Sequence, residues 1–214
     1  MTQVFELYFD MKNYHYYSET QDELESNPLD FTLYFKEHKF VFTTDNGVFS
    51  KKYLDFGSYT LLNAFRSNSI SEPILDVGCG YGPLGIIISK LYDKEVIMLD
   101  INERAINLTN KNILQNNASK CRAQKSYLFD SLDKNIRFSS IVTNPPIRAG
   151  KKVVFEIYEK SFEFLKENGE LWVVIQKKQG APSSKTHLEE IFGNCEIICK
   201  DKGYYILKSV KKTF

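Results

Sequence analysis

The sequence predicts an α/β fold in which a mostly parallel β-sheet carries helices on both faces. From Ile74 onward, apolar runs of strand length alternate with longer segments whose apolar residues recur at helical spacing. This alternation is typical of parallel strands joined by crossover helices. Only Asp201-Lys202-Gly203 separates the last two apolar runs, so they should form a hairpin that reverses the last strand. Polar residues and glycines follow three of the strands, at the edge where such sheets bind ligands.

The individual elements follow from apolar spacing and from residues that begin or end helices. Strands are expected at residues 74–77, 95–100, 121–127, 138–143, 169–176, 195–200 and 203–208. Helices are expected at about 58–65 and at 83–91, 102–115, 151–167 and 185–192. Asn102 predicts an N-cap with Glu103 in the first turn of its helix. Asn168-Gly169 predicts the C-cap of the helix that begins at Lys151.

Upstream of the sheet, the sequence predicts a small β-hairpin. The run from Leu29 to Phe35 alternates apolar with other residues, and Phe40-Val41-Phe42 returns after a turn at residues 36–39. Asp45-Asn46-Gly47 predicts a second turn. We therefore expect residues 1–57 to form an N-terminal arm and hairpin extension, and residues 58–214 to form the main domain.

Composition narrows the class of protein. The 214 residues suit one domain with a small appendage, and 28 Lys and Arg against 27 Asp and Glu give a net charge of +1, which excludes a globally basic protein. No basic, apolar leader is visible at the start, and the apolar runs are too short to span a membrane. Four widely spaced cysteines and three histidines have no metal-like spacing. The sequence thus predicts a cytoplasmic protein with reduced thiols, no membrane segment and no metal.

The most informative stretch is Asn144-Pro145-Pro146-Ile147, which closes the apolar run that ends at Thr143. Proline fixes its own φ and restricts the residue before it, so this stretch predicts a stiff corner. The corner projects the Asn144 amide and presents backbone carbonyls as acceptors. Two acceptors fixed side by side suit a planar amino group, because they take both hydrogens and leave the lone pair aimed elsewhere. Asn144 and Pro145 are therefore candidate catalytic residues.

A glycine-rich turn at residues 78–82 follows the first core strand and precedes a helix. Glycine lets the backbone adopt positive φ and approach a ligand, and the helix N-terminus adds oriented N–H groups. The next strand ends at Asp100, whose carboxylate can accept both hydrogens of a ribose diol. The spacing Gly80-x-Gly82-x-x-Gly85 also matches a dinucleotide fingerprint, which indicates a dehydrogenase. Asp76 and Gly78 favour another register, in which the acid suits a cationic amino-acid moiety.

In that register the chain resembles the class I S-adenosylmethionine-dependent methyltransferases. The turn with its preceding acid matches the family's first motif, Asp100 matches its ribose-binding acid, and the Asn-Pro-Pro corner matches its amino-methyltransferase motif. The resemblance implies a Rossmann-like, seven-stranded sheet and S-adenosylmethionine as cofactor. It implies that the cofactor-binding residues are Asp76, Gly78, Cys79, Gly80, Gly82, Asp100, Ile101 and Asn144.

Four further stretches narrow the resemblance, at residues 47–50, 54–58, 144–151 and 176–183. Together they are similar to the bacterial 16S rRNA guanine-N2 methyltransferases of the C type, here in a short form without the extra domain of longer members. This implies rRNA or the small ribosomal subunit as substrate, and it implies that Phe49, Ser50 and residues 55–58 lie near the cofactor. Many members have Phe where this chain has Ile147. The stacking aromatic would then be another residue, and Tyr16, Tyr17, Phe49 and Tyr81 are candidates.

Basic residues near the corner are candidates for contact with RNA phosphates. The candidate substrate-binding residues are Pro146, Ile147, Arg148, Lys151 and Lys177. Lys152 and Lys178 extend this rim, whereas Lys208, Lys211 and Lys212 are expected to be a frayed basic tail.

Two other functions stay open at this point. Adenine-N6 and protein-glutamine methyltransferases use the same Asn-Pro-Pro corner, although their motifs end in Tyr or Phe rather than Ile147. A non-catalytic RNA-binding assembly factor on this fold is the other alternative, and the intact glycines, Asp100 and Asn144 argue against it.

Overall fold

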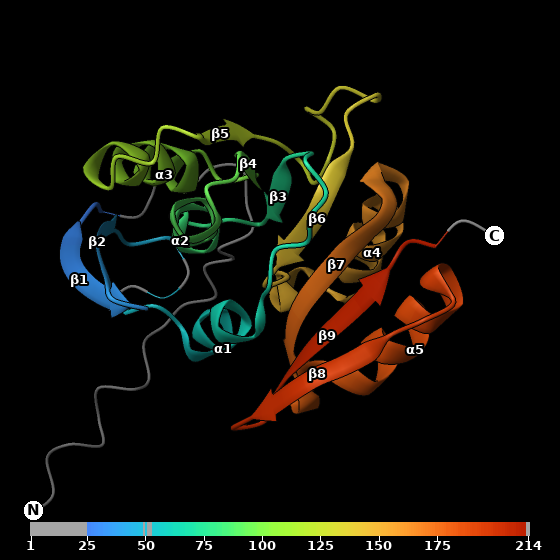
Figure 1. Ribbon diagram of the computed structural model, residues 1–214. Helices are drawn as coiled ribbons and strands as arrows, with labels where there is room; N and C mark the ends of the chain where they lie inside the picture. Colours follow the sequence, from blue (N-terminus) through green and yellow to red (C-terminus); the bar gives the residue numbers. More distant parts are fainter. Residues whose placement is uncertain (1–24, 49, 51–52, 213–214) are drawn as a thin grey trace, which may run out of the picture.

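A seven-stranded β-sheet forms the centre of the computed structural model, which describes residues 25–48, 50 and 53–212 (Figure 1). The strand order is β5-β4-β3-β6-β7-β9-β8. The bounds are β3 Ile74–Val77, β4 Val96–Asp100, β5 Cys121–Lys125, β6 Phe138–Thr143, β7 Leu165–Gln176, β8 Glu196–Asp201 and β9 Tyr204–Val210. Strands β5, β4, β3, β6 and β7 pair in parallel, whereas β9 pairs antiparallel with both β7 and β8. The predicted Rossmann-like sheet with a reversed last strand is confirmed.

Five helices cover the two faces of this sheet among the described residues. They are α1 Phe56–Ala64, α2 Pro83–Tyr92, α3 Glu103–Gln115, α4 Lys151–Phe164 and α5 Ala181–Phe192. The sheet has one apolar core on each face, and successive residues of a strand point to opposite cores. Ile74 packs in the cluster that contains residues of α1, α2 and α3, and Leu75 packs in the cluster that contains residues of α4 and α5. Both sides of each central strand are therefore apolar, as in a parallel sheet buried on both faces.

The hairpin is present and is part of the main core. Strands β1 (Leu29–Phe35) and β2 (His38–Thr44) pair antiparallel around Lys36 and Glu37, which both have positive φ. Phe35, Phe40 and Phe42 are buried in the same cluster as residues of α1 and α2. The hairpin thus shares a core with the sheet, while the division at residues 57 and 58 stays a prediction.

Several predicted boundaries are wrong. Helix α4 ends at Phe164 rather than 167, and β7 begins at Leu165, so Asn168-Gly169 is not a C-cap. Asn168 has φ 61° within β7, and its N–H donates to the Lys211 carbonyl at 2.8 Å. The fifth predicted strand, expected at residues 169–176, therefore starts earlier, because the pairing of this segment with the chain near Lys211 competes with the helix.

Two further expectations near the C-terminus are corrected. Helix α5 begins at Ala181 rather than 185, which is compatible with Pro182 because proline fits the first helical turn. The lysines expected to form a frayed tail are partly held in place. Lys208 lies in β9 between Glu170 and Glu196, at 3.7 and 3.8 Å, and Lys211 Nζ donates to the Leu165 carbonyl at 3.0 Å.

No helix among the described residues combines the length and apolar character needed to cross a bilayer.

Candidate active site

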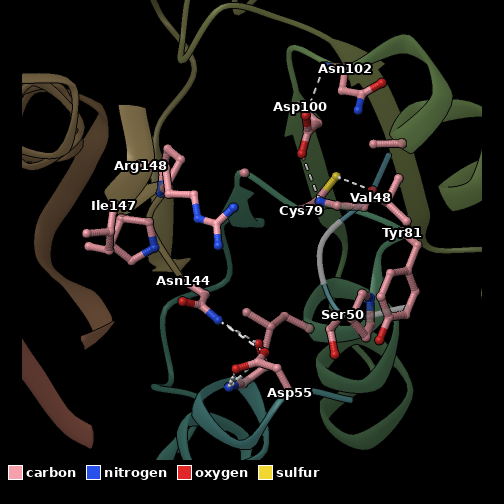
Figure 2. A pocket seen from close by; sticks show the side chains of 18 of the residues that line it. Val48, Ser50, Asp55, Cys79, Tyr81, Asp100, Asn102, Asn144, Ile147 and Arg148 are labelled. Atoms are coloured by element: carbon pink, nitrogen blue, oxygen red, sulfur yellow. Dashed lines mark hydrogen bonds between the residues drawn. The ribbon is translucent and has the colours of Figure 1, made fainter. Parts of the chain in front are cut away.

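One cavity of about 280 Å³ lies at the carboxyl ends of β3, β4 and β6 (Figure 2). Its walls combine the glycine-rich turn after β3, the end of β4, the corner after β6, and residues of the segment that leads from the hairpin into α1. The lining residues are Val48, Ser50, Asp55, Ser58, Gly78, Cys79, Gly80, Tyr81, Pro83, Leu84, Asp100, Asn102, Ala105, Asn144, Pro145, Pro146, Ile147, Arg148, Gln176, Gln179 and Tyr204. The three motifs found separately in the sequence therefore meet at one cavity.

The turn after β3 leaves open space beside its glycines. Gly78 and Gly80 have φ of 75° and 58°, and a Cβ built on either would meet no heavy atom of the described residues within 4 Å. The Gly78 and Cys79 N–H groups both donate to the Leu99 carbonyl, which joins the turn to β4. Because the backbone here favours glycine and no described residue fills the space beside it, the turn is shaped to accept a ligand at close range.

Asp100 is held with its carboxylate on the cavity wall. Its Oδ2 accepts the Gly80 N–H and its Oδ1 accepts the Asn102 N–H, both at 2.9 Å. Burial raises the pKa of Asp100 to about 6, while these two hydrogen bonds act in the opposite direction. Each oxygen keeps a further lone pair, so the carboxylate can accept two hydroxyl groups side by side, as predicted for a ribose diol.

The structure does not place Asp76 on the wall of this cavity. The side chain is fully buried, and its Oδ2 accepts the Gly85 N–H at 3.0 Å, which ties β3 to the first turn of α2. Burial raises the pKa of Asp76 to about 7, and Oδ1 has no hydrogen-bond partner in the part of the chain that the structure describes. Any contact of Asp76 with a ligand stays a prediction, and the contact that is seen is internal.

Of three further predicted cofactor-binding residues, two line a cavity and one does not. Cys79 lines the large cavity, and burial raises the pKa of its thiol, which keeps it neutral. Ile101 lines a smaller adjoining cavity of about 10 Å³ together with Gly78 and Asp100. Gly82 lines neither; it is the N-cap of α2 with φ 89°, where a Cβ would meet the Thr109 side chain at 2.7 Å.

Asn144 follows directly on β6 and faces the cavity with a fixed side chain. Its Nδ2 donates to Asp55 Oδ2 at 3.1 Å and to Ser58 Oγ at 3.0 Å, as Figure 2 shows for these dashed contacts. The carbonyl of Pro145 accepts the Ile147 N–H at 2.8 Å, so one of its lone pairs is in use and one remains. The corner thus presents two oxygen acceptors, the Asn144 Oδ1 and the Pro145 carbonyl.

The predicted substrate-binding residues are only partly brought together. Pro146, Ile147 and Arg148 line the cavity, whereas Lys151 and Lys177 lie outside its lining. Lys151 Nζ lies over the Phe155 ring at 4.8 Å from the centroid, and Lys177 begins a short 3₁₀ turn after β7.

Two polar residues and one aromatic were not predicted at this site. Gln176, Gln179 and Tyr204 all line the cavity. Gln176 ends β7 and pairs with Tyr204 at the start of β9, so the reversed strand delivers an aromatic ring beside the last residue of its neighbour. The predicted hairpin between the last two strands was the available signal, but the register was not readable from sequence.

Part of the segment before α1 lines this cavity, while its predicted place beside the cofactor stays a prediction. Ser50, Asp55 and Ser58 line the cavity, as do Val48 and Tyr81. Phe49, Tyr16 and Tyr17, which were named as candidates for stacking, fall outside the described residues. Within the residues that the structure describes, no group of three His, Cys, Asp or Glu side chains is arranged to hold a metal ion.

Comparison with known proteins identifies the family. A family model described as methyltransferase small domain matches residues 39–208. The chain belongs to this methyltransferase family. The match spans the cavity and all three of its motifs, and it confirms the predicted methyltransferase class with S-adenosylmethionine as cofactor.

Individual members of the family are similar over most of the chain. An uncharacterized Bacillus subtilis protein, YbxB, is 50% identical over 198 residues, which is 92% of this chain and 98% of that protein. The ribosomal RNA small subunit methyltransferase C of Buchnera aphidicola is 33% identical over 78% of this chain and 49% of its own length. This chain therefore spans about half of that curated rRNA methyltransferase.

A solved structure supports the same family assignment. The T. thermophilus 16S rRNA N2 G1207 methyltransferase, RsmC, determined with AdoMet and guanosine, superposes with a TM-score of 0.76 at 25% identity. The match covers 88% of this chain and 52% of that one. The fold of this methyltransferase domain is thus shared with an enzyme that acts on a guanine amine.

Proposed function

We propose that this protein transfers a methyl group from S-adenosylmethionine to the exocyclic N2 amine of a guanine in small-subunit rRNA. The observation that carries the proposal is the meeting of Asn144, Asp100 and the turn at Gly78 and Gly80 in one cavity. One side of that cavity is suited to a nucleoside-containing cofactor, and the other presents paired acceptors suited to an amino group. rRNA as substrate also predicts the cytoplasm as the compartment.

The cofactor side fits a nucleoside with a short polar chain. The open backbone at Gly78 and Gly80 admits close approach, and the Asp100 carboxylate accepts hydroxyl groups. Bound S-adenosylmethionine supplies an electrophilic methyl group on a sulfonium. The residues of this chain would hold that group in the cavity, which the Asn144 corner also lines.

The acceptor side determines which nucleophile reacts. The Asn144 Oδ1 and the Pro145 carbonyl can each accept one hydrogen of an exocyclic amine, which turns the nitrogen lone pair toward the methyl group. The same two dipoles stabilise the positive charge that grows on nitrogen in the transition state. Orientation of both reactants contributes further, on the order of 7 kcal/mol in favourable cases. The product cation loses its proton to water, so no dedicated base is needed.

The remaining wall of the cavity would hold the target guanine. Ile147 and Tyr204 offer apolar and aromatic surface, and Gln176 and Gln179 offer amide groups that can hydrogen-bond base edges. Arg148 lies at this wall, and Lys151 and Lys177 lie beyond it on exposed surface suited to phosphates.

Similarity to named relatives favours guanine N2 over the alternative substrates, whereas Ile147 alone does not, because many C-type guanine-N2 enzymes also have Phe at this position. Adenine-N6 and protein-glutamine enzymes with this corner end their motif in an aromatic residue, which this chain lacks. Similarity to the Buchnera and T. thermophilus enzymes also supports small-subunit rRNA as the substrate.

The proposal is tested by mapping methylated nucleosides in rRNA from cells with and without the gene, using mass spectrometry on separated 16S and 23S rRNA. We expect loss of one N2-methylguanine from 16S rRNA, restored by the wild-type gene and not by Asn144→Ala. Loss of N6-methyladenine instead, or an unchanged set of nucleosides in both rRNAs, would reject the proposed substrate.

A further inference from the structure

The Asn144 amide uses both of its hydrogens on the protein side. One N–H of Nδ2 points to Asp55 Oδ2 at 3.1 Å and the other to Ser58 Oγ at 3.0 Å. A side-chain amide has two donor hydrogens on nitrogen and an acceptor oxygen. With both hydrogens taken, the polar atom left for a ligand is Oδ1, and Figure 2 shows it at the end of the amide turned away from Asp55.

The chemistry of Asp55 fixes which way the amide faces. An ionised carboxylate only accepts hydrogen bonds, so it pairs with the nitrogen of the amide and repels the oxygen. A hydroxyl such as that of Ser58 can donate or accept, and alone would permit either orientation. The carboxylate is therefore the partner that distinguishes the two ends of Asn144.

Asp55 is itself held in place by the start of α1. It is the N-cap of that helix: its Oδ1 accepts the Gly57 N–H at 2.8 Å, and the Ser58 N–H lies 3.3 Å from each of its oxygens. One oxygen thus serves mainly the helix and the other serves Asn144. The same side chain therefore caps the helix backbone and also binds a residue 89 positions away in the sequence.

We propose that Asp55 is a positioning residue that sets the orientation of the Asn144 amide, so that Oδ1 faces the substrate amine. This inference rests on the proposed function for its effect on methyl transfer. Its geometric part, the fixed amide, stands in the free protein. Asp55 touches no reacting atom; it acts through Asn144 and with Ser58 as a secondary partner.

Two substitutions at residue 55 separate positioning from helix capping. In Asp55→Asn, the amide oxygen keeps the cap because it faces the Gly57 N–H, and the new NH₂ then meets the Asn144 NH₂. Two donors cannot pair, so the Asn144 amide turns over and aims its NH₂ at the substrate. In Asp55→Ala the cap is lost, which lowers the melting temperature, and the Asn144 amide is no longer biased toward either orientation.

The expected order of rates is opposite to the order of stability. Asp55→Asn should melt close to wild type, yet its kcat should fall by roughly 100-fold, the range seen when one preorganised dipole is lost. Asp55→Ala should melt lower but keep more activity than Asp55→Asn. Cofactor affinity should change less than threefold in both. A role limited to structure would make activity follow stability, and that result would overturn the proposal.

Rates of double and control variants test whether Asp55 acts through Asn144. In an Asn144→Ala background, Asp55→Asn should lower the remaining rate by less than twofold, because the group it misdirects is gone. Ser58→Ala should reduce kcat by less than tenfold, and Asn63→Ala, on the exposed side of α1, should have no effect. A full 100-fold loss in the Asn144→Ala background would show that Asp55 acts independently.

NMR of the free protein examines the amide without any RNA. The Asn144 NH₂ resonances, assigned by their loss in Asn144→Ala, should be well dispersed in wild type and shift markedly in Asp55→Asn. Unchanged resonances would overturn the proposal whatever the substrate is. If wild type methylates no RNA while these resonances shift, the proposed function fails and the positioning geometry holds.

Discussion

Asn112 on α3 pairs with the backbone of Thr43 on β2 through both ends of its side-chain amide. The Thr43 N–H donates to Oδ1 at 2.7 Å, and Nδ2 donates to the Thr43 carbonyl at 2.8 Å. Asn116, one helical turn on, makes the same pair of bonds with Val41. The distance between residues i and i+4 of a helix nearly equals the distance between residues i and i+2 of a strand. The side-chain amides of Asn112 and Asn116 therefore pair with the backbone of β2 as a neighbouring strand would. Asn112 Nδ2 also donates to the carbonyl of Tyr81, beside the cofactor cavity.

Asn112→Ala should therefore loosen the hairpin and the cavity together. The buried N–H and carbonyl of Thr43 would lose their partner, at about 1–3 kcal/mol for each unsatisfied group. We expect the free energy of unfolding in denaturant to fall by about 2 kcal/mol or more, and cofactor affinity to fall as well. The matched control is Asn110→Ala, which changes an exposed residue of the same helix and should alter neither quantity. Equal behaviour of the two variants would contradict the pairing.

Tyr81→Phe should separate protein stability from ligand binding. The Tyr81 hydroxyl is buried at the cavity wall and has no hydrogen-bond partner among the described residues, and burial raises its pKa, so it remains a neutral donor. Removal of an unsatisfied donor should leave the melting temperature of the free protein unchanged or higher. Cofactor affinity should fall by about tenfold, because a bound ligand would supply the missing acceptor. Tyr92→Phe is the control with opposite results: its hydroxyl donates to the Phe65 carbonyl, so stability falls and cofactor affinity does not.

The convergence at the cavity was predictable because it follows from topology. Gly78, Asp100 and Asn144 each follow a parallel strand, and such strands end at the same edge of a sheet. Contacts that depend on register or on distant pairing were not readable. Tyr204 reaches the cavity because it pairs with Gln176. The resemblance implied that Asp55 and Asn144 both lie near the cofactor, but the hydrogen bond between them, across 89 residues, had no local signal.

The boundary between α4 and β7 shows a second limit of sequence reasoning. Leu165 continues the apolar spacing of the helix, and Asn168-Gly169 has the composition of a helix end, so the pattern favours a longer helix. The structure instead extends β7 through these residues, with Asn168 and Lys211 joined by a backbone hydrogen bond. Pairing between distant segments outweighs the local preference here.

Cofactor affinity and protein stability should respond to pH in opposite directions. Burial raises the pKa of Asp100 from 3.8 to about 6, so the contribution of Asp100 to the stability of the free protein is fully present below 3.8 and is lost as pH rises through about 6. Asp76, raised to about 7, adds a change of the same sign. Hydroxyl donors bind the ionised form of Asp100, so the cofactor dissociation constant should rise up to tenfold per pH unit below about 6.

Asp100→Asn provides the check on this pH dependence. Calorimetric titration of the cofactor between pH 5 and 8 should give a weak, nearly constant affinity in the variant and a pH-dependent affinity in wild type. A wild-type affinity that does not change over this range would mean that Asp100 does not accept the cofactor hydroxyls.

Gly57→Ala should disturb the cavity although alanine favours helices. A Cβ at residue 57 would lie 2.7 and 2.9 Å from two ring carbons of Tyr204 and 3.0 Å from Asp55 Oδ1. These contacts are shorter than van der Waals distances, so Tyr204 or Asp55 must move. We expect a lower melting temperature and a slower methyl transfer. Tyr204→Leu in the same chain should restore the melting temperature by removing the ring; failure of that rescue would place the strain elsewhere.

The basic residues beyond the cavity should contribute to RNA binding through phosphates. Lys177 and Lys178 follow the end of β7 and are exposed, next to the cavity residues Gln176 and Gln179. Lys177→Glu with Lys178→Glu should weaken binding of a 16S rRNA fragment, and each lost phosphate contact should reduce the slope of log affinity against log salt by about 0.7 to 0.9. Lys111→Glu with Lys134→Glu, at exposed positions outside the cavity lining, is the charge-matched control and should leave the slope unchanged. Because release of counterions depends on the number of phosphates contacted, an unchanged slope in the double variant would show that these lysines are only solvated surface charges.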